Sequence, residues 1–174
     1  MVNEKYMRQL ERIFKKGKDN SVKVSFFDLP MVEEIIEEKI SQELFQKPRA
    51  FYEGLSNLEN YTPEQPVIEA TLRPYQEQGY KWLHYMQDNQ LGGCLADDMG
   101  LGKTLQTITL LADVYKKDVN TPSLIIMPKS LLYNWQREVK KFAPKLSTYI
   151  FHGNDRDLEA ALKVNLIFYN LLYC

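Results

Sequence analysis

Residues 97–104 read Asp-Asp-Met-Gly-Leu-Gly-Lys-Thr (DDMGLGKT), and this stretch decides the fold. The apolar segment Gly92–Ala96 precedes it and is expected to form a short strand, while helical spacing follows over Lys103–Tyr115. Between a strand and a helix, glycines let backbone N–H groups turn toward phosphate oxygens, and the helix N-terminus adds free donors. The sequence therefore predicts a phosphate-binding loop, with Lys103 reaching the β and γ phosphates and the Thr104 hydroxyl binding Mg²⁺.

The loop departs from the strict phosphate-loop pattern at one position. That pattern requires a glycine six residues before the lysine, and this chain has Asp97 there. The strand-then-helix context favours a functional loop despite the departure, and Gly100 and Gly102 are expected to supply the turn and the close approach to phosphate. The alternative interpretation is a glycine-rich turn carrying a solvated lysine.

Strand and helix patterns alternate after residue 70. This alternation predicts an α/β fold with a mostly parallel sheet. Because Ser123–Met127 (SLIIM) is wholly apolar, we expect it to be a buried parallel strand. The other expected strands are Gly92–Ala96, Thr148–Phe151 and Val164–Tyr169, and the expected helices are Tyr75–Met86, Lys103–Tyr115, Leu131–Phe142 and a turn at Leu158–Leu162.

Residues 1–70 carry no chemical motif and are interpreted as a mainly helical extension. Apolar spacing predicts a helix over about residues 3–17, an extended piece at 22–27 and a helix capped by Asp28. A further short helix is expected at Ala50–Leu55. Residues 57–70 show little periodicity and are interpreted as a linker, which puts a domain boundary near residue 70.

Composition limits the class of protein further. The chain has 174 residues, and its 22 basic and 23 acidic side chains give a net charge of −1, so charge alone does not require a nucleic-acid partner. No apolar run reaches the roughly 20 residues that span a bilayer, and the charged start of the chain does not resemble a signal peptide. Two cysteines favour a reduced, cytoplasmic setting, with Cys94 as a small buried residue of its strand.

Three segments resemble the SWI/SNF-type ATPases of helicase superfamily two. Asp97–Thr107 (DDMGLGKTLQT) resembles motif I, in which an acidic residue commonly occupies the first glycine position. Leu72–Leu83 (LRPYQEQGYKWL) resembles the adenine-recognition segment, and Ser123–Pro144 resembles motif Ia. The resemblance covers about residues 71–174, is closest to the bacterial branch, and implies the N-terminal part of the first RecA-like lobe.

The resemblance also implies roles for individual residues. Gln76 would read the adenine edge and Arg73 would lie beside the nucleotide, which makes ATP with Mg²⁺ the expected ligand. Lys129 and Ser130, at the start of the helix after motif Ia, would hold a phosphate of double-stranded DNA without reading its sequence. Lys103 and Thr104 would be the catalytic residues and Thr104 the only metal contact, through the nucleotide. The whole nucleotide-binding set is Arg73, Gln76, Asp97, Asp98, Met99, Gly100, Leu101, Gly102, Lys103 and Thr104.

Hydrolysis in this family also needs an acidic pair of the DEAH type, and no such motif occurs in the 174 residues. We therefore expect the chain to bind ATP without hydrolysing it, as the truncated part of a translocase or remodeller that acts on DNA, DNA-bound proteins or the transcription machinery. An incomplete sheet edge would allow self-association, and no membrane contact is expected. Two alternatives stay open: another phosphate-loop enzyme, either a nucleotide kinase or a GTPase, and a non-catalytic module that binds DNA or a partner.

Overall fold

The computed structural model describes Asp28, Val32 and residues 42–64, 67–117, 121–154 and 156–170. The chain forms two compact units, Met1–Asn57 and Leu58–Cys174. The elements that the sequence predicts over residues 3–17 and 22–27 lie outside the described residues, as does nearly all of the helix expected after Asp28. The domain boundary expected near residue 70 remains a prediction.

One helix of the first unit is described along its length. Helix α3 spans Gln42–Ser56 and passes through Pro48. The helix expected at Ala50–Leu55 is thus confirmed, but it begins eight residues earlier than its local pattern predicts. A single 3₁₀ turn, Leu58–Asn60, opens the second unit, and residues 61–64 and 67–73 contain no helix or strand.

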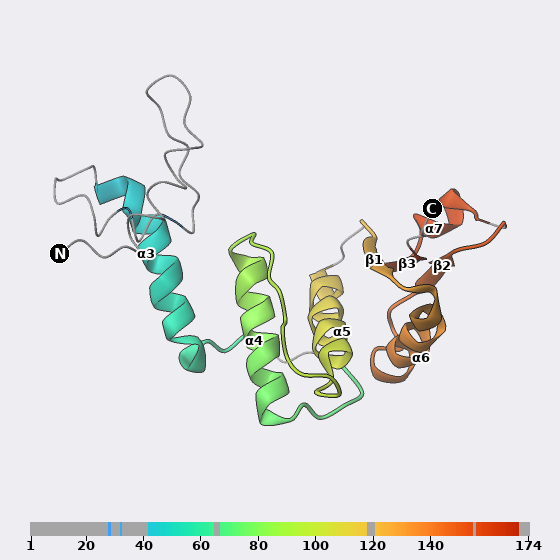
Figure 1. Cartoon of the computed structure of the whole chain (residues 1–174), viewed down its shortest axis with the longest axis horizontal. Coiled ribbons are helices and arrows are strands. Elements are labelled where there is room, and N and C mark those ends of the chain that lie inside the picture. Colours follow the sequence, from blue (N-terminus) through green and yellow to red (C-terminus); the bar gives the residue numbers. More distant parts are fainter. Residues whose placement is uncertain are drawn as a thin grey trace, which may run out of the picture. The chain divides into compact units, whose positions relative to one another are not determined.

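The second unit has an α/β architecture built around a parallel sheet (Figure 1). The strand order is β1-β3-β2, and β3 pairs in parallel with both neighbours, with Leu166 opposite Ser123 on one side and Thr148 on the other. The predicted fold class is confirmed. The elements are α4 (Pro74–Asp88), α5 (Lys103–Val114), β1 (Ser123–Met127), α6 (Leu132–Phe142), β2 (Thr148–Phe151), α7 (Leu158–Ala161) and β3 (Leu166–Asn170).

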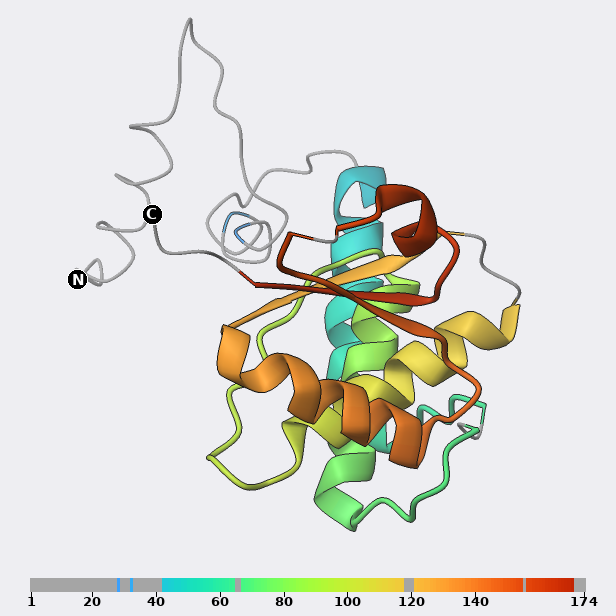
Figure 2. The ribbon, with the colours of Figure 1, turned by 90° about the vertical axis from the view of Figure 1, so that its right-hand side faces the viewer.

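The core lies on the face of the sheet that α6 covers, whereas α7 lies on the opposite face (Figure 2). Leu166 and Phe168 of the central strand are fully buried and pack with Ile108 of α5 and Val139 of α6. The ring of Trp135 meets Phe168 edge to face with a centroid separation of 6.4 Å. Because these side chains come from three elements distant in sequence, burying them fixes α5 and α6 against the sheet.

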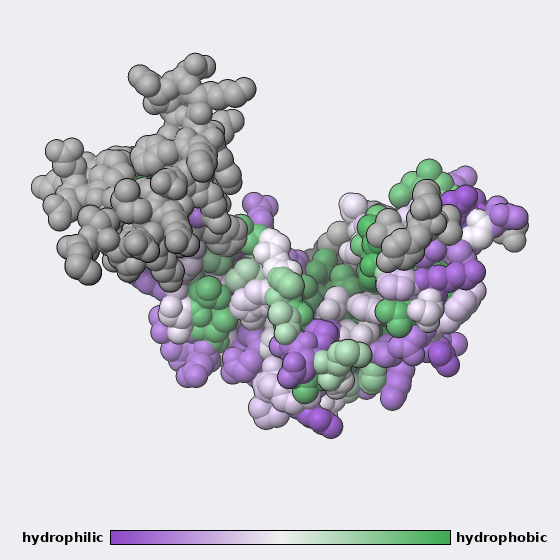
Figure 3. Space-filling model, viewed as in Figure 1, coloured by the Kyte–Doolittle hydropathy of each residue, from purple (hydrophilic) through white to green (hydrophobic). Residues whose placement is uncertain are grey.

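Three sequence predictions about strands were wrong. Gly92–Ala96 is not a strand, because no described strand lies beside it to supply ladder hydrogen bonds, and Cys94 within it is exposed rather than buried. Strand β1 is buried on one face only, with Leu124 57% and Ile126 51% exposed. The space-filling view shows apolar side chains among the polar ones on this face of the second unit (Figure 3). Strand β3 is shifted, since it begins at Leu166 instead of Val164.

A polar network joins α4, α5 and the segment before α4. His84 Nε2 lies 2.9 Å from Asp113 Oδ2, and both side chains are buried. The Tyr61 hydroxyl donates to Asp88 Oδ2 at 2.5 Å and lies 2.5 Å from His84 Nδ1. Burial first, and the Asp88 carboxylate second, raise the pKa of Tyr61 well above its ordinary value, so the phenol keeps its proton. The network therefore fixes α4, which carries Gln76, against α5, which carries Lys103.

Candidate nucleotide-binding site

The loop Asp97–Thr104 turns sharply just before α5. Gly100 and Gly102 both have left-handed backbones, with φ of +87° and +78°. Gly102 is the residue that caps α5, so Lys103 and Thr104 form its first two helical positions. The unpaired N–H groups of that first turn and the positive end of the helix dipole together favour a bound anion. The glycine geometry expected from the sequence is therefore present.

The Lys103 side chain bends back over the start of the loop. Its Nζ donates to the carbonyl oxygens of Asp97 at 2.6 Å and Asp98 at 2.7 Å. The ammonium group thus lies over the loop itself, paired with two of its carbonyl oxygens. A cation held there adds to the helix N-terminus as a second source of positive potential.

A cleft of about 840 Å³ opens between the loop and helix α6. Gly100, Gly102, Lys103 and Thr104 line one side. Helix α6 lines the other with Asn134, Arg137, Glu138 and Lys141, so three cationic side chains border the space. Met99 also lines it and is almost wholly exposed, at 97%. The contribution of α6 was not predicted, because it depends on how that helix packs against α5.

Gln76 connects the adenine-recognition segment to the loop. Its side chain is 7% exposed; Oε1 accepts from the Arg73 N–H at 3.0 Å, and Nε2 donates to the Leu101 carbonyl at 3.1 Å. An amide has four hydrogen-bonding positions, so one N–H and one lone pair remain for a further partner. Arg73 is exposed, and its Nη1 donates to the Tyr75 hydroxyl at 3.5 Å.

Gln106 is a residue of the site that the sequence did not single out. It lies one turn beyond Lys103 on α5, is 0% exposed, and donates from Nε2 to Asp97 Oδ2 at 3.2 Å. The available signal was a long polar side chain one helical turn after the lysine of the loop. Its contact with α4 could not be foreseen from sequence, since it requires the two helices to be packed.

Lys129 and Ser130 lie apart from the loop residues in sequence but follow β1 directly. They occupy a 3₁₀ turn, Lys129–Leu131, at the start of α6, and both are exposed. Leu131 also lines the cleft described above, so the same turn borders the loop. The position at a helix start agrees with the sequence prediction, while a DNA contact remains a prediction.

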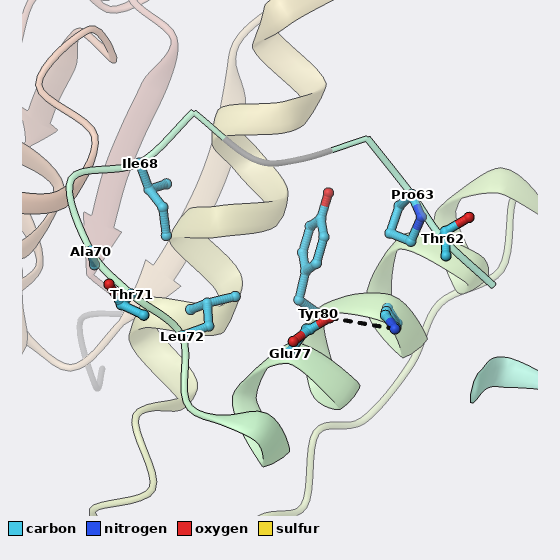
Figure 4. Close-up of a pocket in the computed structure, with 9 residues that line it drawn as sticks. Thr62, Pro63, Ile68, Ala70, Thr71, Leu72, Glu77 and Tyr80 are labelled. Carbon is cyan, nitrogen blue, oxygen red and sulfur yellow. Dashed lines mark ion pairs between the residues drawn. The ribbon is translucent and has the colours of Figure 1, made fainter. Parts of the chain in front are cut away.

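A second cavity, of about 390 Å³, lies between α4 and the residues 62–63 and 68–72 (Figure 4). Ile68, Leu72 and Tyr80 line it, and an ion pair of 3.4 Å joins Glu77 and Lys81 at its side. None of the loop residues lines this cavity. It is therefore separate from the candidate nucleotide site.

Among the described residues, no helix has the length and apolar character needed to cross a membrane.

Comparison with protein families gives a match to the SNF2-related domain over residues 75–169. The chain is 33% identical over 172 residues to the "Putative ATP-dependent helicase/translocase YwqA" of Bacillus subtilis, covering 89% of this chain and 19% of that protein. It is 48% identical over 102 residues to the ISWI chromatin-remodeling complex ATPase ISW2 of Saccharomyces cerevisiae, covering 58% of this chain and 9% of that protein. The chain thus spans about a fifth, or less, of the length of these relatives.

A solved structure agrees with these sequence matches. The Sulfolobus solfataricus SWI2/SNF2 ATPase core in complex with dsDNA superimposes with a TM-score of 0.57 at 47% sequence identity, over 62% of this chain and 23% of that one. The parallel sheet and its helices are therefore those of a SWI2/SNF2 ATPase core lobe. Because the family match covers more than half of the chain, and the phosphate loop lies within it, the chain belongs to the SNF2-related domain family.

Proposed function

We propose that the chain is the ATP-binding part of a translocase or remodeller that acts on double-stranded DNA. The observation that carries the proposal is the loop at the start of α5, in which Lys103 Nζ lies 2.6 Å from the Asp97 carbonyl oxygen and two glycines are left-handed. The Lys103 ammonium group and the N–H groups at the start of α5 fit a triphosphate. Residues 71–174 would form the nucleotide-binding part, and residues 1–70 would be an extension whose role is not assigned.

The nucleotide would be ATP. Gln76 keeps one N–H and one lone pair, which is what an adenine edge requires, and its bond to the Leu101 carbonyl joins base recognition to the phosphate loop. Arg73, next to it, would contact the nucleotide from the exposed side. Asp98, Met99 and Leu101 would contribute backbone groups only. Thr104 would hold Mg²⁺, which when bound neutralises part of the triphosphate charge.

The DNA contact would be made by Lys129 and Ser130, which are exposed at the start of α6. A structural relative is a SWI2/SNF2 ATPase core in complex with dsDNA, which supports duplex DNA as the partner. Since no DEAH-type acidic pair occurs in the 174 residues, the chain alone would bind MgATP without hydrolysing it.

Thermal shift with MgATP and MgGTP tests the base preference. We expect ATP to raise the melting temperature more than GTP, with affinities about tenfold apart, because the guanine edge leaves the Gln76 amide mismatched. The variant Gln76→Ala should lose the preference. Gln87→Ala, on the exposed part of the same helix, is the matched control and should keep it. Stronger protection by GTP would favour the GTPase alternative, and no protection by either nucleotide would favour the non-catalytic module.

A further inference from the structure

Asp97 raises a physical question that a phosphate-binding loop must answer. A carboxylate at the start of such a loop lies close to where phosphate charge would be held, and like charges repel strongly in a partly buried site. Glycine, which the general pattern has at this position, creates no such repulsion. The structure should therefore contain something that keeps this carboxylate away from the phosphates.

Asp97 is placed on the side of the loop that faces α4. It lines a cavity with Tyr75, Gly79 and Trp82, and it does not line the cleft bordered by Gly100–Thr104. Its Oδ2 accepts a hydrogen bond of 3.2 Å from Gln106 Nε2. Lys103 Nζ bonds the carbonyl oxygen of the same residue, so Asp97 is held through both its backbone and its side chain.

Only one orientation of the Gln106 side-chain amide can hold the Asp97 carboxylate. The side chain is fully buried, and its Oε1 has no hydrogen-bond partner among the described residues. Turning the amide over would place Oε1 against the Asp97 carboxylate, oxygen against oxygen, so the N–H end must face Asp97. Gly79 of α4 makes room for it, since a Cβ there would overlap Gln106 Oε1. In this orientation the buried Oε1 of Gln106 has no hydrogen-bond partner in the described part of the chain, which costs free energy. A glutamine with a purely structural role would not need this costly orientation.

We propose that Gln106 is a positioning residue that holds the Asp97 carboxylate away from the phosphates, with the Gln106 amide itself seated in the notch that Gly79 of α4 leaves open. The proposal rests on the proposed function, nucleotide binding at this loop. It explains how a loop with an acidic residue in place of its first glycine still binds an anion. Gln106 and Gly79 are then needed for MgATP binding only while residue 97 carries a negative charge.

The test is a double-mutant cycle in the 174-residue chain, with MgATP affinity measured by calorimetry. Gln106→Met keeps the side-chain volume and removes the donor, and we expect it to weaken MgATP binding about tenfold or more. Asp97→Asn removes the charge and is the reference for the double variant. The double variant should bind within about twofold of Asp97→Asn. A double variant as weak as Gln106→Met would mean that Gln106 acts through packing alone, and would overturn the proposal.

The same four proteins are also compared by urea unfolding without nucleotide. We expect the effects of Gln106→Met and Asp97→Asn on unfolding to be non-additive, because the two side chains share a hydrogen bond. If the unaltered chain bound no MgATP, the proposed function would fail, and this second cycle would still decide whether Gln106 positions the Asp97 side chain: coupling would support the pair, and strict additivity would overturn it.

Discussion

Replacing Phe168 by alanine is expected to destabilise the Leu58–Cys174 unit by about 3–5 kcal/mol. Among the described residues, Phe168 is the largest fully buried side chain; it lies in the central strand and packs against residues of α5 and α6. Truncation removes an aromatic side chain and leaves a cavity that α5 and α6 would have to close. Since domains of this kind are stable by about 5–15 kcal/mol, the loss approaches the whole margin.

Urea unfolding followed by circular dichroism measures this effect. Leu124→Ala is the matched control, because Leu124 is an apolar residue on the neighbouring strand whose side chain is 57% exposed. It should cost less than about 1 kcal/mol. Equal losses from the two substitutions would mean that the core does not lie on the α6 face of the sheet.

The substitution Gly102→Ala is expected to weaken MgATP binding about thirtyfold to a hundredfold. Its φ of +78° costs an alanine about 1–2 kcal/mol, and the added Cβ would overlap Gln76 Nε2. The loop and the Gln76 amide would both have to move. A combined penalty of about 2–3 kcal/mol corresponds to that loss of affinity at 1.4 kcal/mol per tenfold.

Alanine substitutions at two other glycines show how much of that loss of affinity comes from the backbone and how much from the contact with Gln76. Gly100 is also left-handed, with φ of +87°, but nothing lies within 4 Å of its added Cβ, so Gly100→Ala should show the backbone cost alone. Gly92 has neither constraint, and Gly92→Ala should leave calorimetric affinity unchanged. A Gly102→Ala chain that binds MgATP as well as Gly92→Ala would show that the loop and Gln76 are not joined in the way their hydrogen bond indicates.

Local pattern was enough to predict most elements of the second unit. Strands β1 and β2 have the predicted bounds, and α4, α5 and α6 agree with their predictions to within two residues at each end. These segments carry their own periodicity, and the glycines of the loop carry their own backbone requirement. The left-handed Gly100 and Gly102 therefore follow from the sequence alone.

Features that depend on distant partners could not be predicted in this way. Gly92–Ala96 has the composition of a strand, but a strand needs a neighbour, and none is described beside it. Leu124 and Ile126 have the composition of buried residues, yet no described element covers them. Gln106 and Asp97 are nine residues apart and meet only because the loop turns at Gly100 and Gly102 before α5 begins, so no periodicity along the chain could reveal the pair.

The most direct test of nucleotide binding is a calorimetric titration of MgATP into the 174-residue chain and into its Lys103→Ala variant. We predict one nucleotide per unaltered chain. We also predict an affinity at least about a hundredfold weaker in the variant, because the ammonium group that lies 2.6 Å from the Asp97 carbonyl oxygen is removed. Melting curves of both proteins establish that the variant is folded. An unaltered chain that binds no MgATP, or a folded Lys103→Ala variant that binds it equally well, would contradict the assignment of this loop as the nucleotide site.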